Sequence, residues 1–214
     1  MNQNGRQDAV TLIHHKQNSM EKKSIKGTQT EKNLLTAFAG ESQARNRYTI
    51  FESVARKEGY GQIADFFKQT ADQERMHAKM LFSHLEGGPV EITATYPAGK
   101  IGTTRENLLE AAEGENEEWT DMYPTFAQIA EDEGFTSVAL LMRNIIKAEQ
   151  EHERLYRLFL ERIEKDNIFQ EEEEVVWKCR VCGYVHKGKQ PPKKCPVCQH
   201  PQGYIERLTD APVI

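Results

Sequence analysis

The sequence contains two Glu-x-x-His motifs, a spacing that can bring a carboxylate and an imidazole to one metal ion. Glu74 is followed by His77, and Glu149 is followed by His152. Residues three apart lie on the same face of a helix, so both side chains of each pair can reach a common ion. A single pair of this kind is more typical of an exposed, solvated helix surface. One motif alone would therefore be weak evidence for a metal site.

Each motif is preceded by another glutamate, about one helical hairpin earlier in the chain. Glu41 lies 33 residues before Glu74, and Glu115 lies 34 residues before Glu149. This near-equal spacing is what a duplicated helix pair would produce. Carboxylates that are buried together require compensating cations. Carboxylate oxygens combined with imidazole suit iron or manganese better than a metal that prefers thiolates, so the repeat predicts such a metal pair.

Three further side chains could act beside this cluster. Glu118 lies one turn after Glu115, which brings five carboxylates and two histidines within reach of one site. Tyr48 lies seven residues after Glu41 on the same helix face. It could donate a hydrogen bond to a ligating carboxylate, or it could be an ordinary core residue. Tyr123 is a weaker candidate for the same role.

A second candidate metal site lies in the last fifth of the chain, where two C-x-x-C pairs supply Cys179, Cys182, Cys195 and Cys198. Four thiolates at this spacing suit a tetrahedral metal. The spacing alone leaves zinc and iron open, and zinc is the commoner metal in chains with this pattern. The aromatic residues Trp177, Tyr184 and Tyr204, together with a redox-type cluster in the same chain, favour iron, with zinc as a product of misloading.

Long segments with apolar residues at helical spacing must position these groups. The pattern predicts helices from Thr28 to Gly59, from Gln62 to Glu86, from Thr103 to Glu133 and from Gly134 to Lys165. Pro124 lacks a backbone donor and should kink the third helix. The prolines and glycines of 89–102 indicate a crossover connection. Four helices with one long middle connection predict an all-α, ferritin-like four-helix bundle.

The composition and the segment boundaries limit the possible functions. We expect a flexible N-terminal extension at 1–27, the helical bundle at 28–168, and an acidic linker with the four-cysteine domain at 169–214. No apolar run approaches the roughly 18 residues that cross a bilayer, so we expect no membrane partner. The net charge of -5 without a basic stripe argues against nucleic acid. Paired cysteines in a chain without a signal segment indicate a reducing, cytoplasmic location.

Several motifs closely resemble those of the rubrerythrin family. They are TAFAGESQAR at 36–45, TADQER at 70–75, MYP at 122–124, and the rubredoxin-like CRVCGY at 179–184. The resemblance covers the chain from about residue 24 onward. It implies a di-iron site with Glu41, Glu74, Glu115, Glu118, Glu149 and His152 as ligands, of which Glu74 and Glu149 bridge the irons. His77 matches the histidine that binds one iron in the reduced state.

The resemblance also implies an activity and a set of partners. Rubrerythrins are non-haem iron peroxidases that reduce hydrogen peroxide to water and protect against oxidative stress. Electrons arrive from NAD(P)H through separate reductases or rubredoxin and enter at the rubredoxin-like iron. The family forms homodimers. Because a carboxylate favours Fe(III) and a neutral imidazole favours Fe(II), we expect Glu118 and His77 to alternate at one iron, which makes them catalytic candidates together with Tyr48.

Two other function classes remain as alternatives. A ferritin-type protein that oxidises and stores iron would explain the bundle, but it would leave the four-cysteine domain without a role. An interaction module with a structural zinc ribbon would leave the paired Glu-x-x-His motifs unexplained. The enzyme hypothesis uses both sites, and we therefore rank it first.

Overall fold

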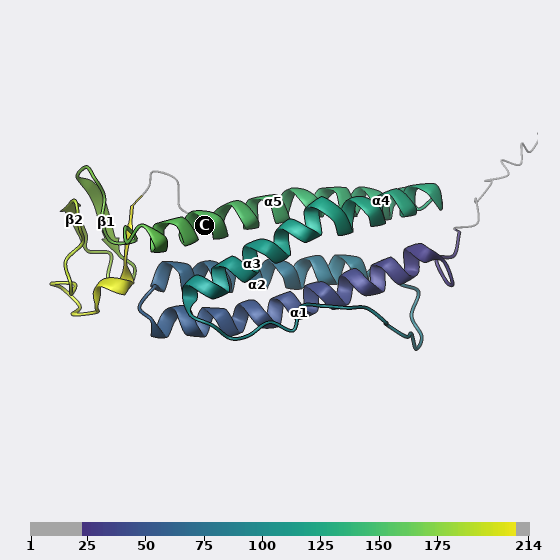
Figure 1. The fold of residues 1–214 in the computed structure, drawn as a ribbon, viewed down its shortest axis with the longest axis horizontal. Helices are drawn as coiled ribbons and strands as arrows, with labels where there is room; N and C mark the ends of the chain where they lie inside the picture. Colours follow the sequence, from purple (N-terminus) through teal and green to yellow (C-terminus); the bar gives the residue numbers. More distant parts are fainter. Residues whose placement is uncertain (1–22, 209–214) are drawn as a thin grey trace, which may run out of the picture.

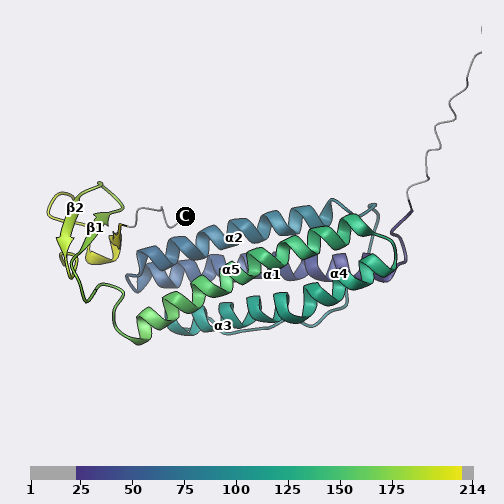
Figure 2. The same ribbon diagram turned by 90° about the horizontal axis from the view of Figure 1, so that it is seen from above.

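A computed structural model describes residues 23–208 of the chain. Its helical part consists of α1 (Gln29–Lys57), α2 (Gly61–Phe82), α3 (Thr104–Glu117), α4 (Tyr123–Asp132) and α5 (Thr136–Glu164). Helix α1 packs along α2, and α3 and α4 together pack along α5 (Figure 1). The predicted ferritin-like bundle is confirmed. The view from above shows the small C-terminal domain at one end of the bundle (Figure 2).

The helix ends follow from local capping chemistry. The Thr28 side chain accepts a hydrogen bond from the backbone N–H of Glu31 at the start of α1. Thr103 and Glu106 form a capping box before α3. Helix α2 ends at Phe82, four residues earlier than predicted. Ile25, which lies within the N-terminal extension predicted at 1–27, is buried in the core, and its N–H donates to Glu86.

The third predicted helix is not continuous. Between α3 and α4 the chain forms a π-helix, η1 (Glu118–Met122), in which the Tyr123 N–H donates to the Glu118 carbonyl five residues earlier. Pro124 lies in the first turn of α4, where its missing N–H matters least. The sequence predicted a kink at Pro124. The structure shows instead that the helix widens before the proline, starting at Glu118.

Two apolar clusters fill the bundle, with a polar layer between them. One cluster contains Tyr48, Phe67, Leu108 and Tyr156, and the other contains Leu34, Leu81, Tyr123, Met142 and Ile145. The buried glutamates of all four long helices fall between these clusters along each helix. The helices therefore carry carboxylates to one common level. No helix between residues 23 and 208 is both long and apolar enough to span a membrane.

The C-terminal domain is a small antiparallel sheet. Its strands β1 (Val175–Cys179), β2 (Val185–Gly188) and β3 (Ile205–Arg207) lie in the order β2-β1-β3, and the 3-10 helix η2 (Gln202–Tyr204) precedes β3. Trp177 of the central strand is buried with Cys179, Cys195 and Ile205. Because only two buried apolar residues accompany the cysteines in this core, a bound metal would contribute much of its stability.

The C-terminal domain contacts the start of α2. Arg180 forms ion pairs with Asp65 of α2 and with Glu206 of β3. A side chain at Gly61 would overlap the backbone of Gly203, so these glycines permit a close backbone approach between the domains. The helical bundle and the C-terminal domain are thus joined to each other by an ion pair and by direct backbone packing.

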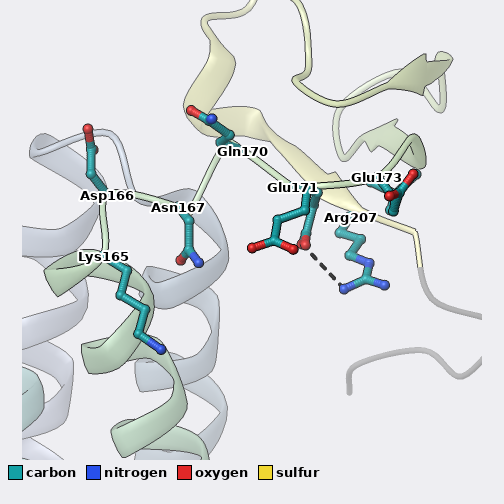
Figure 3. A pocket seen from close by; sticks show the side chains of 9 residues that line it. Lys165, Asp166, Asn167, Gln170, Glu171, Glu173 and Arg207 are labelled. Atoms are coloured by element: carbon teal, nitrogen blue, oxygen red, sulfur yellow. Dashed lines mark hydrogen bonds and ion pairs between the residues drawn. The ribbon is translucent and has the colours of Figure 1, made fainter.

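The connection from α5 to β1 borders an open, polar pocket of about 720 Å³ (Figure 3). Glu171, at the start of the predicted acidic linker, accepts from Arg207 at 3.3 Å and is only partly exposed. The next three glutamates are exposed, as expected for a solvated linker. The pocket contains no residue of either predicted metal site.

Candidate metal centres

The side chains predicted to bind metal in the bundle converge on two adjacent positions. One position is surrounded by Glu41, Glu74, His77 and Glu149, and the other by Glu74, Glu115, Glu149 and His152. Within each group, one ligand atom per residue lies within 4.8 Å of all the others. Glu74 and Glu149 belong to both groups, which is the arrangement required of carboxylates that bridge two ions.

The two histidines face these carboxylates through Nδ1. In His77 this atom lies 2.9 Å from Glu74 Oε2 and 3.0 Å from Glu149 Oε1. In His152 it lies 2.8 Å from Glu149 Oε2 and 3.2 Å from Glu74 Oε1. Despite these distances, the Nδ1 atoms and the facing oxygens lack the angular geometry of hydrogen bonds. Buried polar atoms that converge without bonding one another are suited to a shared metal ion.

The electrostatics of the cluster also require cations. Burial and the charge of Glu74 raise the pKa of Glu41 and of Glu115 well above the usual carboxyl range. Burial opposes the protonation of His77, but the oxygens of Glu149, Glu41 and Glu74 outweigh it and raise its pKa. The pKa of His152 rises for the same reason. Without metal, protons must neutralise this layer, and metal ions would replace them.

Two buried tyrosines hold the outer carboxylates. Tyr48 donates its hydroxyl hydrogen to Glu115 Oε1 at 2.5 Å, and Tyr123 donates to Glu41 Oε1. Burial, followed by the charges of these glutamates, raises the pKa of both phenols. Both hydroxyls therefore remain donors at neutral pH. The sequence ranked Tyr123 below Tyr48, but the two tyrosines occupy equivalent positions on the two halves of the cluster.

A glutamine that the sequence analysis missed contacts one of the histidines. Gln73 Oε1 lies 3.0 Å from His152 Nε2, on the side of the ring opposite the carboxylates. Its amide oxygen can only accept, so Nε2 must carry the hydrogen whenever Nδ1 acts as a ligand. The only available signal was its position directly before Glu74, and glutamine is too common in helices for that to indicate a role.

Glu118 lies apart from the two converging groups. It begins the π-helix, is partly exposed, and lines a cavity beside the cluster. Burial of its carboxyl group, followed by the charges of Glu41 and Glu115, raises the pKa of Glu118 well above the usual carboxyl range. In this arrangement His77 completes one metal position, while Glu118 stays at the edge of the site.

The four cysteines come together as the spacing predicted. The Sγ atoms of Cys179 and Cys198 are 3.6 Å apart, and those of Cys182 and Cys195 are 3.5 Å apart. All four sulfurs belong to one group with ligand geometry. Burial opposes ionisation of Cys195, but the backbone N–H groups of Cys198 and Val197 outweigh it and lower its pKa to about 6. These N–H groups thus stabilise a thiolate.

The two cysteine turns have equivalent backbone geometry but different residues after the second cysteine. The Gly183 N–H donates to the Cys179 carbonyl, and the Gln199 N–H donates to the Cys195 carbonyl, each at 2.9 Å. Both residues have positive φ, 77° at Gly183 and 62° at Gln199. The first turn therefore has the residue that this conformation favours, and the second does not.

Comparison with known families identifies both domains. The family model "Rubrerythrin" matches residues 32–160, and the model "Rubrerythrin, rubredoxin-like domain" matches residues 177–206. The chain belongs to the rubrerythrin family. The bundle cluster is accordingly the di-iron carboxylate site of a rubrerythrin, and the four cysteines form its rubredoxin-like iron site.

Individual relatives agree with this assignment. A rubrerythrin from Porphyromonas gingivalis is 60% identical over 186 residues, which cover 87% of this chain and 93% of the relative. A rubrerythrin from Nitratidesulfovibrio vulgaris is 52% identical and covers 87% of this chain and 97% of its own length. A nigerythrin structure in a mixed-valence state is 29% identical, with a TM-score of 0.57, over 96% of this chain and all of that one.

Proposed function

We propose that this rubrerythrin reduces hydrogen peroxide to water and thereby protects against oxidative stress. The observation that carries the proposal is the presence, in one chain, of two adjacent carboxylate/histidine metal positions and a docked four-cysteine site. When bound, the iron pair supplies the two electrons that the reaction H₂O₂ + 2e⁻ + 2H⁺ → 2H₂O requires. A storage protein would use the first site but not the second.

In this proposal the residues of the bundle have distinct roles. Glu74 and Glu149 would bridge the irons, because each belongs to both converging groups. Glu41 and Glu115 would bind the outer sides, where Tyr123 and Tyr48 fix their orientation. His152 would bind the second iron, and its tautomer is set by Gln73.

We further infer that His77 and Glu118 alternate as ligands of the first iron. In the present arrangement His77 faces Glu41, Glu74 and Glu149, whereas Glu118 lies at the edge of the site. A neutral imidazole favours ferrous iron and a carboxylate favours ferric iron, so His77 would hold the reduced ion and Glu118 the oxidised one. Structures of both oxidation states test this inference, and identical coordination in both would contradict it.

The four-cysteine domain would bring electrons to the bundle from rubredoxin or from NAD(P)H-dependent reductases. It contacts α2 near Gly61, thirteen residues before Glu74, or about 20 Å away along the helix. This separation favours delivery by the tail of a second copy, as the homodimers of the family would allow. We also propose a cytoplasmic location, where a reducing environment keeps the four thiols available for metal.

The decisive experiment mixes the reduced, iron-loaded protein with hydrogen peroxide and, separately, with oxygen in a stopped-flow spectrometer. We expect fast reoxidation by peroxide and slower reoxidation by oxygen. Faster reaction with oxygen, accompanied by deposition of additional iron, would instead support the storage function.

A variant of the tail tests the path of the electrons. Cys179→Ser should abolish turnover driven by NADH and a reductase, yet preserve the reaction of the chemically reduced bundle, because Cys179 belongs only to the four-thiolate site. Lys178→Ser, at the exposed neighbouring position, is the matched control. Undiminished NADH-driven turnover in Cys179→Ser would show that electrons enter elsewhere.

A further inference from the structure

A cavity of about 310 Å³ lies beside the bundle metal site and has no role in the function proposed so far. Its walls come from α1, from α3 and from the π-helix, and the connection between α2 and α3 covers it. In Figure 1 this connection runs without a helix or strand along α1 to the start of α3. Glu118 and Tyr48 also line the cavity, and Tyr48 donates to the candidate ligand Glu115.

Two helix glycines form part of the cavity walls. Gly40 directly precedes Glu41 in α1, and Gly114 directly precedes Glu115 in α3, so they occupy equivalent positions in the two halves of the bundle. Glycine inside a helix costs roughly 1 kcal/mol relative to alanine. A Cβ at Gly114 would meet no atom within 4 Å, so packing does not require glycine there. Because Gly114 has no side chain, space stays open in the cavity beside the candidate ligand Glu115.

The cover of the cavity is fastened at two points. Tyr96 donates its hydroxyl hydrogen to the Thr36 carbonyl at 2.6 Å, and the Gln43 side chain donates to the Pro97 carbonyl at 2.7 Å. Tyr96 is half-buried, whereas the other residues from 86 to 101 are more exposed. Its ring lies on Gly40, where an added Cβ would be 3.4 Å from the ring. The tyrosine ring therefore closes the cavity directly over α1.

The cavity offers groups that a small polar molecule can bind. Arg47 lines it, and its Nε is buried without a hydrogen-bond partner in the described part of the chain, while its Nη2 pairs with Glu110 at 2.8 Å. Glu118, which also lines the cavity, supplies a carboxyl oxygen as an acceptor. A molecule that both donates and accepts hydrogen bonds, as hydrogen peroxide does, matches these groups.

We propose that this cavity is the route by which hydrogen peroxide reaches the metal centre, and that Tyr96 is the specificity-determining residue that excludes bulky hydroperoxides. The proposal rests on the proposed peroxidase function. Gly114 keeps the inner part of the route open, and the fastened Tyr96 ring limits its outer part. An obstruction in a route slows both the arrival and the departure of a ligand, but it leaves the equilibrium affinity of the centre unchanged.

The test uses full-length, iron-loaded, chemically reduced protein in a stopped-flow spectrometer. Hydrogen peroxide and cumene hydroperoxide report on the reaction, and nitric oxide, a small ligand of ferrous iron, reports on access without turnover. Gly114→Leu should slow the reaction with hydrogen peroxide, and both the association and the dissociation of nitric oxide, by about tenfold, with an unchanged nitric oxide Kd. Tyr96→Ala should raise the rate with cumene hydroperoxide, relative to hydrogen peroxide, by about tenfold.

Control variants separate a blocked route from a damaged site. Glu113→Leu adds the same side chain at the exposed neighbouring position of α3 and should leave all rates unchanged. Tyr96→Phe retains the ring but loses the hydrogen bond to Thr36, so its preference between the two peroxides should lie between those of wild type and Tyr96→Ala. Wild-type rates in both Gly114→Leu and Tyr96→Ala would overturn the proposal. So would a weaker nitric oxide Kd with an unchanged association rate in Gly114→Leu.

The two proposals fail in different ways. If the reduced wild-type protein reacts slowly with hydrogen peroxide, the peroxidase function fails, whereas the nitric oxide rates still show whether the cavity is the route. If Gly114→Leu does not fold, Tyr96→Ala alone decides, because this exposed connection contributes little to the core. An unchanged preference between the two peroxides in Tyr96→Ala would then reject the role of Tyr96.

Discussion

Three buried tyrosines allow the support of the metal ligands to be measured by removing single oxygen atoms. Tyr123 and Tyr48 donate to Glu41 and Glu115, respectively. Tyr156 is equally buried and packs against Tyr48, with ring centroids 5.5 Å apart, but its hydroxyl faces Thr70 without the geometry of a hydrogen bond. Replacement by phenylalanine thus removes a hydrogen bond at two positions and only an unpaired hydroxyl at the third.

The expected stability changes follow from these contacts. A buried hydrogen bond to a carboxyl group contributes about 1–3 kcal/mol when its loss leaves the partner unpaired. For a protein of this size each kcal/mol shifts Tm by about 2–4 °C. Tyr123→Phe and Tyr48→Phe should therefore lower the Tm of the metal-free protein by about 2–12 °C. Tyr156→Phe should leave Tm unchanged or raise it slightly, because it removes a buried polar atom without a partner.

Metal affinity provides a second measurement on the same variants. Loss of a hydrogen bond that orients a ligand typically weakens metal binding by about 10- to 100-fold. We expect this loss for Co²⁺ binding to the bundle in Tyr123→Phe and Tyr48→Phe, but not in Tyr156→Phe. If all three variants unfold at the same temperature and bind Co²⁺ equally well, the hydroxyls do not support the ligands, and the reasoning from these hydrogen bonds is refuted.

Three other predictions concern protons, the tautomer of a ligand and backbone strain. Because the pKa values of Glu41, Glu115, His77 and His152 are raised, the metal-free native state binds more protons than the unfolded chain. Its free energy of unfolding, measured with urea, should therefore fall as the pH rises from about 5 to 8. The slope should reach up to about 1.4 kcal/mol per pH unit for each extra bound proton. A rise in the free energy of unfolding over this range would contradict the raised pKa values. Gln73→Leu should weaken Co²⁺ binding by about 10- to 100-fold, because it removes the contact with His152. Gln69→Leu, four residues earlier in α2, is the control and should leave the affinity unchanged. Equal affinities of the two variants would exclude a role for the Gln73 contact. Gln199→Gly should stabilise the iron-loaded tail by about 1 kcal/mol, and Gly183→Ala should destabilise it by a similar amount, because both positions have positive φ. Both changes are measured as the thermal loss of the iron–thiolate absorption. Changes of the opposite sign would refute the strain argument.

The sequence predicted most of the metal-binding geometry because periodicity constrains it strongly. Glu74 and His77 are three residues apart, and so are Glu149 and His152, which places each pair on one helix face in any regular helix. The cysteine turns are equally local. In both cases a few residues of known spacing determine the relative positions of the ligand atoms, and the structure brings these atoms together.

Contacts between helices could not be predicted in the same way. The bond from Tyr123 to Glu41 joins residues 82 apart, and the contact of Gln73 with His152 joins residues 79 apart. Such contacts depend on how the helices are rotated against each other. The π-helix at Glu118 changes that rotation, and a proline six residues later signals an interruption without showing its type.

The features that cost stability in the bundle lie at one level. The buried carboxylates, the π-helix and the wall glycines Gly40 and Gly114 occupy the layer between the two apolar clusters. Each of these features costs stability by itself, through desolvation, altered hydrogen bonding or chain entropy. The clusters on both sides supply apolar burial that does not depend on the metal. The surrounding core therefore stabilises a local structure that the residues of this layer would not form alone. Local spacing predicts the ligands here but not the π-helix, and this layer is where the fold can retain a metal site and an open route to it.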